Sequence, residues 1–137
     1  MVNQVNQNVL WQPSPEAVRA AQVTAFREAL AASSGRALPD TDALHAYSVS
    51  EPGAFWSAVW DFVGVVGDKG ERALIDAHAM PGARFFPDAR LSFAENLLVR
   101  GDEHVALVFL DERGTRRTLS YRALGEQVAS MASALRA

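Results

Sequence analysis

Residues 80–98 read MPGARFFPDARLSFAENLL, and they decide how the rest of the chain is interpreted. The stretch holds two prolines, three phenylalanines and two arginines, on a path that starts irregularly and then turns into a helix. Proline removes a backbone donor and fixes φ, so neither a regular helix nor a regular strand accounts for the first part. A connector ordered by aromatic side chains has to dock on a large surface. The sequence therefore predicts an anchored connector over residues 80–91, and the question is whether its docking surface lies in this chain.

The end of the quoted stretch carries a helix start signal. Ser92 stands at a cap position, and Glu95 follows three residues later, which is the arrangement of a capping box. We predict a short helix over residues 92–98. Arg84 and Arg90 flank the aromatic part, where we expect ion pairs or solvent exposure in preference to anion binding.

Upstream, three start signals predict three helices. Residues 14–16, Ser-Pro-Glu, supply a cap, a first-turn proline and an acid at the positive end of the helix dipole. This first helix is predicted to run over residues 15–32 as one element, and Gly35 ends it. Residues 39–42 open a short second helix, and residues 50–52 open a third.

The third helix carries a broad aromatic face, made of Phe55, Trp56, Val59, Trp60, Phe62 and Val63. A face this wide is usually buried against more than one neighbour, which favours a core or docking role. Stacking of a ligand on Trp56 and Trp60 is the less favoured interpretation. Residues 68–79 are mixed and mostly polar, and they predict no particular element.

After residue 100 the pattern changes. Residues 104–110 are apolar and partly β-branched, which predicts a buried strand, followed by a turn and a returning strand at 116–119. Ser120 caps a helix whose apolar positions are Leu124, Val128, Met131 and Leu135. These elements open an α/β domain, and one such unit cannot cover its own sheet faces. The helical pattern reaches Ala137 without a stop signal, so we expect a truncated piece of a longer protein.

The composition is that of a globular segment. The chain has 137 residues, a formal net charge of −3 and no cysteine. Scattered basic residues argue against nucleic acid and against a polybasic membrane contact. No apolar run approaches the ~20 residues of a membrane span, and no signal peptide is present. We predict a cytoplasmic protein without nucleic-acid or membrane partners, and a loose terminus over the polar residues 1–10.

No motif supplies a self-contained active site. Neither a GxxxxGK(S/T) phosphate loop nor a GxGxxG fingerprint occurs. Residues 67–70, Gly-Asp-Lys-Gly, follow a helix, which predicts a surface turn in preference to a phosphate cradle. His45, His78 and His104 lie far apart, so metal ligation is the weaker interpretation. The sequence thus offers no catalytic, cofactor-binding or metal-binding residue.

Two stretches resemble the acyl-CoA synthetases. Residues 48–62, SVSEPGAFWSAVWDF, are similar to the N-terminal extension of the short-chain enzymes. Residues 80–98 resemble the acetoacetyl-CoA synthetase form, which typically reads MPGAxWFPGAxLNYAENL. The chain departs from that pattern at Phe85, Asp88, Ser92 and Phe93.

The resemblance extends toward both ends of the chain. WQPS at residues 11–14 fits the opening of the acetoacetyl-CoA synthetases, and TLSY at residues 118–121 resembles the start of the AMP-binding domain of adenylate-forming enzymes. NLLVR at residues 96–100 stands where acetyl- and propionyl-CoA synthetases usually have an Asn-x-x-Asp-Arg-His run. This difference favours the acetoacetate branch.

The resemblance implies an incomplete α/β fold. Residues 1–100 would be a mostly helical N-terminal extension, and residues 101–137 the first strands and helix of an AMP-binding domain. It also implies an acid–thiol ligase that joins acetoacetate to CoA while ATP, held with Mg²⁺, gives AMP and diphosphate. The family's phosphate loop, ribose-binding aspartate and catalytic lysine all lie downstream of residue 137. The chain alone is therefore expected to be inactive and to bind none of ATP, CoA and Mg²⁺.

The partner that the resemblance implies is the remainder of the chain's own adenylating domain. The docking residues would be Trp56, Trp60, Phe85, Phe86 and Phe93. Two alternatives stay open: a freestanding interaction module that docks on a partner enzyme, and the N-terminal part of an acetyl- or propionyl-CoA-type synthetase.

Overall fold

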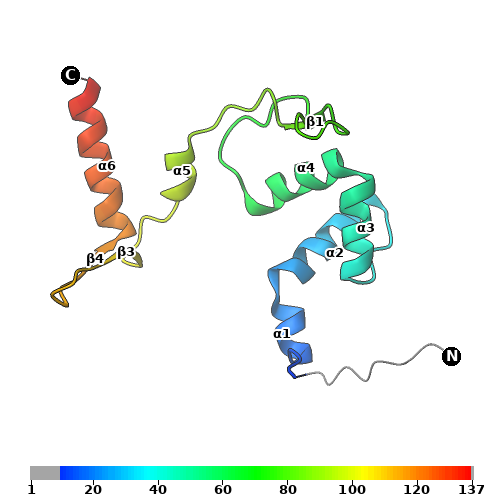
Figure 1. Ribbon diagram of the computed structural model, residues 1–137, viewed down its shortest axis with the longest axis horizontal. Coiled ribbons are helices and arrows are strands. Elements are labelled where there is room, and N and C mark those ends of the chain that lie inside the picture. Colours follow the sequence, from blue (N-terminus) through cyan, green and yellow to red (C-terminus); the bar gives the residue numbers. More distant parts are fainter. Residues whose placement is uncertain (1–9, 137) are drawn as a thin grey trace. The chain divides into compact units, whose positions relative to one another are not determined.

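The computed structural model describes residues 10–136, so the opening predicted as a loose terminus lies almost wholly outside the described part. Short helices and two small sheets follow one another along the chain (Figure 1). In order they are α1 (Pro15–Ala20), α2 (Gln22–Ser34), α3 (Thr41–Ser50), α4 (Pro52–Val63), β1 (Leu74–Ile75), β2 (Arg84–Phe85), α5 (Phe93–Leu97), β3 (Val105–Leu110), β4 (Arg116–Ser120) and α6 (Tyr121–Arg136). The mixture of helices and small sheets is that of a partial α/β protein.

The chain forms two compact units. The helical unit comprises the described residues up to Gly64 together with Glu71–Pro87. The hairpin unit comprises Val65–Gly70 together with the described residues from Asp88 onward. Each unit is described separately below.

The single helix predicted over residues 15–32 is wrong, because the structure breaks it at Ala21. This residue has an extended backbone, with φ −69° and ψ 137°, between α1 and α2. The Thr24 hydroxyl donates a hydrogen bond of 2.7 Å to the Val18 carbonyl, which lies just before the break. Threonine side chains compete in this way with the hydrogen bonds of the helix itself. Neither proline nor glycine marks the position in the sequence.

The starts of α1 and α3 agree with their capping signals, whereas α4 begins after Glu51 without a side-chain cap. Ser14 Oγ accepts a hydrogen bond from the Ala17 N–H, and Asp40 Oδ1 accepts one from the Ala43 N–H. Pro52 occupies the first turn of α4. Gly35 ends α2 with φ 67°, a left-handed conformation that glycine adopts without steric cost.

The core of the helical unit is small. Its buried side chains are Phe26, Leu30, Leu38 and Leu44. The Phe26 ring meets two α4 rings edge-on, with centroid distances of 5.6 Å to Phe55 and 5.2 Å to Phe62. Arg27 holds the loop before α3 by donating to the carbonyls of Leu38, at 2.9 Å, and Pro39. One side of the predicted aromatic face thus packs on α2.

Part of the connector is more regular than predicted. β1 and β2 pair antiparallel, with Leu74 opposite Phe85 and Ile75 opposite Arg84. The Phe86 N–H continues the ladder by donating to the Ala73 carbonyl at 2.9 Å. Residues 68–79, for which the sequence predicted no element, supply the partner strand. Strands of two residues are too short for a periodic pattern to reveal them.

In the hairpin unit, the Gly67–Gly70 turn pairs with the end of the connector. Asp68 and Arg90 exchange two backbone hydrogen bonds, of 2.9 and 2.8 Å. A Cβ added at Gly67 would lie 2.6 Å from the Leu91 Cβ, and one added at Gly70 would lie 2.6 Å from the Asp88 Cβ. Close approach of the backbone therefore explains both glycines, as expected for a turn.

Asn96 ties the same turn to α5. Its amide accepts from the Val66 N–H at 2.8 Å and donates to the Val66 carbonyl at 2.8 Å. Ser92 Oγ accepts from the Glu95 N–H at 3.2 Å, which confirms the predicted cap of this helix.

The predicted strands at the end of the chain are present, but the burial expected for the first is wrong. β3 and β4 form an antiparallel hairpin with an irregularity between Val105 and Leu107. Leu107 and Phe109 are 52% and 55% exposed. Two strands and one helix are too few to cover both faces of the hairpin. The predicted helix follows at once as α6, with Ser120 Oγ accepting from the Ala123 N–H at 3.2 Å.

Candidate functional site

The docking surface for the connector lies, at least in part, within this chain. The Phe85 ring meets Trp56 with a centroid distance of 6.0 Å and an interplanar angle of 75°, and Phe86 meets Trp60 at 5.0 Å and 51°. We call these four side chains the aromatic stack. Because α4 also contacts Phe26 through Phe55 and Phe62, its aromatic face packs against two neighbours. This is the arrangement that the width of the face predicted.

The backbone at the stack is unusual. Phe86 has φ 46° and Asp76 has φ 54°, both in the left-handed region that non-glycine residues seldom adopt. Each of these residues directly follows one of the two paired strands. An ion pair of 3.5 Å between Arg84 and Asp76 spans the same hairpin. This ion pair agrees with the role expected for Arg84.

The stack is incompletely covered. Trp56 is 45% exposed, and together with Phe85 and Phe86 it lines an apolar hollow of about 300 Å³. Phe93, the fifth residue of the predicted docking set, belongs to α5 in the hairpin unit and is 75% exposed. The structure thus brings four of the five residues together in one unit and places the fifth on an open surface.

A second hollow lies on the other side of α4. It is a groove of about 580 Å³ between α2, α3 and α4. Its floor is apolar, with Phe26, Leu30 and Phe62, while Tyr47 and Asp61 add polar groups. Its size is within the range of small-molecule pockets, and Ser33, Ser34 and Ser57 also line it.

The hairpin unit carries a third apolar hollow, of about 310 Å³, between α5, β3 and α6. Its lining includes Leu97, Leu107, Leu124 and Val128. Farther along α6, Met131 and Leu135 are exposed as well. The apolar stripe of α6 thus continues beyond the part that the hairpin can cover.

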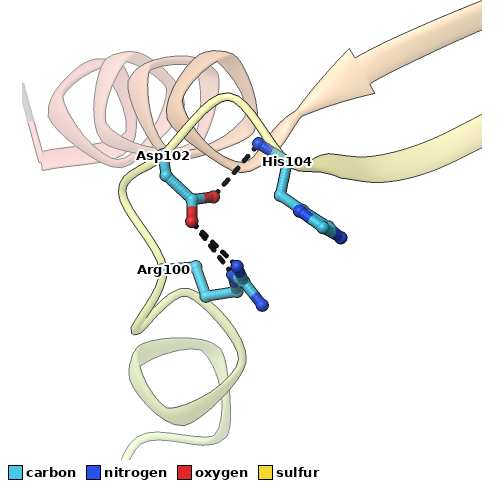
Figure 2. A network of polar contacts seen from close by, with 3 residues as sticks. All are labelled: Arg100, Asp102 and His104. Carbon is cyan, nitrogen blue, oxygen red and sulfur yellow. Dashed lines mark hydrogen bonds and ion pairs between the residues drawn. The ribbon is translucent and has the colours of Figure 1, made fainter.

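A polar network orders the loop before β3 (Figure 2). Asp102 accepts from Arg100 at Nη2 (2.9 Å) and Nε (3.2 Å), and from the backbone N–H of His104 at 3.1 Å. The Arg100 side-chain hydrogen bond, followed by the His104 backbone hydrogen bond, lowers the pKa of Asp102. The Arg100 guanidinium lies 5.8 Å from the centre of the Tyr121 ring.

Glu103, the next acidic residue, also pairs with an arginine. Glu103 forms an ion pair with Arg122, and this contact, together with a hydrogen bond from Ser120, lowers the pKa of Glu103. The backbone N–H groups of Tyr121 and Arg122 donate to the His104 and Asp102 carbonyls, both at 3.0 Å. The network therefore fixes the first turn of α6 against the loop. No periodic pattern in the sequence marks this network, although Arg100, Asp102 and His104 stand at alternating positions.

The described residues form no metal cluster. Within residues 10–136, no three side chains of His, Asp or Glu are placed to hold an ion. His45, His78 and His104 are all exposed. That the segment carries no catalytic or cofactor-binding residue stays a prediction, because the structure does not test it.

Comparison with known proteins finds similar synthetases. No family model matches the chain. The acetoacetyl-coenzyme A synthetase of Rhizobium meliloti is 44% identical over 128 residues, which cover 93% of this chain and 20% of the relative. The solved acetoacetyl-CoA synthetase of Streptomyces lividans matches 92% of the chain with 37% identity and a TM-score of 0.75. The chain is a homologue of the acetoacetyl-CoA synthetases. The family resemblance of the sequence is thereby confirmed.

The synthetase relatives are much longer than this chain, which spans about a fifth of their length. These relatives are also named for different acids. A malonamoyl-CoA synthetase of Penicillium aethiopicum is 33% identical over 139 residues, or 96% of the chain. Likeness in this segment therefore extends to synthetases named for different acids. Over residues 10–136, no helix has the length and apolar character to cross a bilayer.

Proposed function

We propose that the chain is the N-terminal segment of an ATP-dependent acetoacetate–CoA ligase, which converts acetoacetate, ATP and CoA into acetoacetyl-CoA, AMP and diphosphate. The observation that carries the proposal is the 44% identity to the Rhizobium meliloti enzyme over 93% of the chain. The fold likeness to the Streptomyces lividans enzyme supports it independently of the sequence motifs.

In this proposal the segment is structural. Residues 1–100 form the extension of the enzyme, and residues 101–137 begin its AMP-binding domain. The remainder of the same domain is the partner, and it covers the exposed apolar side chains of β3 and α6. Support comes from the exposure of Leu107 and Phe109, since soluble proteins rarely leave a strand of this composition open.

Catalysis is assigned to the part of the enzyme beyond this segment. Adenylation and thiol attack depend on positioning the reactants and on neutralising phosphate charge, with Mg²⁺ on the phosphates. We predict that the isolated chain binds none of ATP, CoA and Mg²⁺ and is inactive. The cytoplasm stays the predicted compartment.

The malonamoyl-CoA synthetase relative favours a second acid as a candidate. Malonamate and acetoacetate have the same length and both carry a carbonyl at the β position, and they differ in an amino group against a methyl group. A ligase for a short acid with a β-carbonyl group is thus the coarser form of the proposal. The freestanding interaction module and the acetyl- or propionyl-CoA-type synthetase have no comparable observation in their favour.

A chimera tests the proposal. The corresponding segment of the Rhizobium meliloti enzyme is replaced by this chain, and acetoacetyl-CoA and AMP are measured with acetoacetate, ATP, Mg²⁺ and CoA. We expect activity within about tenfold of the parent enzyme, because the segment docks and does not react. The control is the same enzyme without the segment, which should be inactive.

Two outcomes would overturn parts of the proposal. A chimera that is monodisperse but inactive would contradict the assignment of the segment to this family of ligases. AMP release by the isolated chain above the blank would contradict the claim that catalysis lies elsewhere.

A further inference from the structure

We draw no further inference here: the strongest candidate, the groove between α2, α3 and α4 that Phe26, Leu30, Tyr47 and Phe62 line, is an unpartnered apolar face, and nothing in the structure shows what covers it.

Discussion

Phe86 holds the connector with a left-handed backbone conformation. A left-handed backbone costs a non-glycine residue about 1 kcal/mol or more. At Phe86 this cost is offset by the hydrogen bond to the Ala73 carbonyl and by the ring contact with Trp60. The neighbouring Phe85 stands where the family resemblance has tryptophan, and its ring still reaches Trp56. The departure therefore keeps an aromatic contact.

Replacing Trp60 by alanine should loosen the connector. The change removes the partner of the Phe86 ring while the strained backbone stays, so we expect a loss of about 2 kcal/mol, below the cost at a fully buried site. The measurement is hydrogen exchange of the α4 and β2 amides in the chimera, where about 2 kcal/mol means roughly thirtyfold faster exchange. Val63→Ala, at an exposed position of α4, is the control and should change little. Equal effects of the two variants would refute the role of the stack.

Gly70 and Gly125 form a matched pair in the hairpin unit. Gly70 has φ 72° and leaves no room for a Cβ beside Asp88, whereas a Cβ at Gly125 on α6 meets nothing within 4 Å. We expect Gly70→Ala to destabilise the unit by about 1–3 kcal/mol and Gly125→Ala to stabilise α6 by up to about 1 kcal/mol.

Urea denaturation of the chimera, followed by amide exchange in the hairpin unit, gives both values. A tolerated alanine at Gly70 would show that the turn does not pack against the connector as described. It would also reopen the interpretation of residues 67–70 as a flexible phosphate-binding loop.

At the scale of elements, the sequence predicted what local chemistry determines. Asp40, Ser92 and Ser120 each accept the backbone hydrogen bond expected of a cap. The break at Ala21 escaped prediction because neither proline nor glycine marks it, and the Thr24 hydrogen bond to the Val18 carbonyl beside it leaves no pattern in the sequence. The pairing of β1 with β2 escaped because it joins two-residue strands across a loop, and its stability comes from contacts with α4.

The loop before β3 should make α6 sensitive to acid. The pKa values of Asp102 and Glu103 are lowered by their arginine partners, so the folded state binds protons less readily than the unfolded chain. The stabilisation is present above the ordinary carboxyl pKa values near 4 and is lost as the pH falls through the lower folded values. Both groups are solvent-exposed, so the effect should be modest and should weaken with added salt.

Circular dichroism of the isolated chain between about pH 6 and pH 2 measures this effect as loss of helix. In Asp102→Asn the acid-dependent loss of helix should be smaller. In Glu126→Gln, a change on the exposed face of α6, the loss of helix should equal that of the parent. If the asparagine variant kept the full acid dependence, the network would not be what anchors α6.

At the scale of the whole molecule, residues 80–98 dock within this chain and leave further apolar surface exposed. Phe85 and Phe86 pack on α4 inside this chain, which composition alone could not reveal, because the contact joins residues about thirty apart. The open side of the stack, Phe93, and the strand β3 stay uncovered in the chain as described. The strand predicted at residues 104–110 is present, but the burial expected for it is wrong in the chain as described.

The central claim is that these residues become part of one adenylating enzyme that covers them. Hydrogen exchange of the β3 amides, measured in the isolated chain and in the active chimera, tests it most directly. In the isolated chain the amides of Leu107 and Phe109 should exchange no more than a few tens of times more slowly than unprotected amides, because two strands alone hold the hairpin weakly. In the chimera they should exchange at least about a hundredfold more slowly. The same rate in both proteins would show that the remainder of the ligase does not cover this strand, and it would contradict the account.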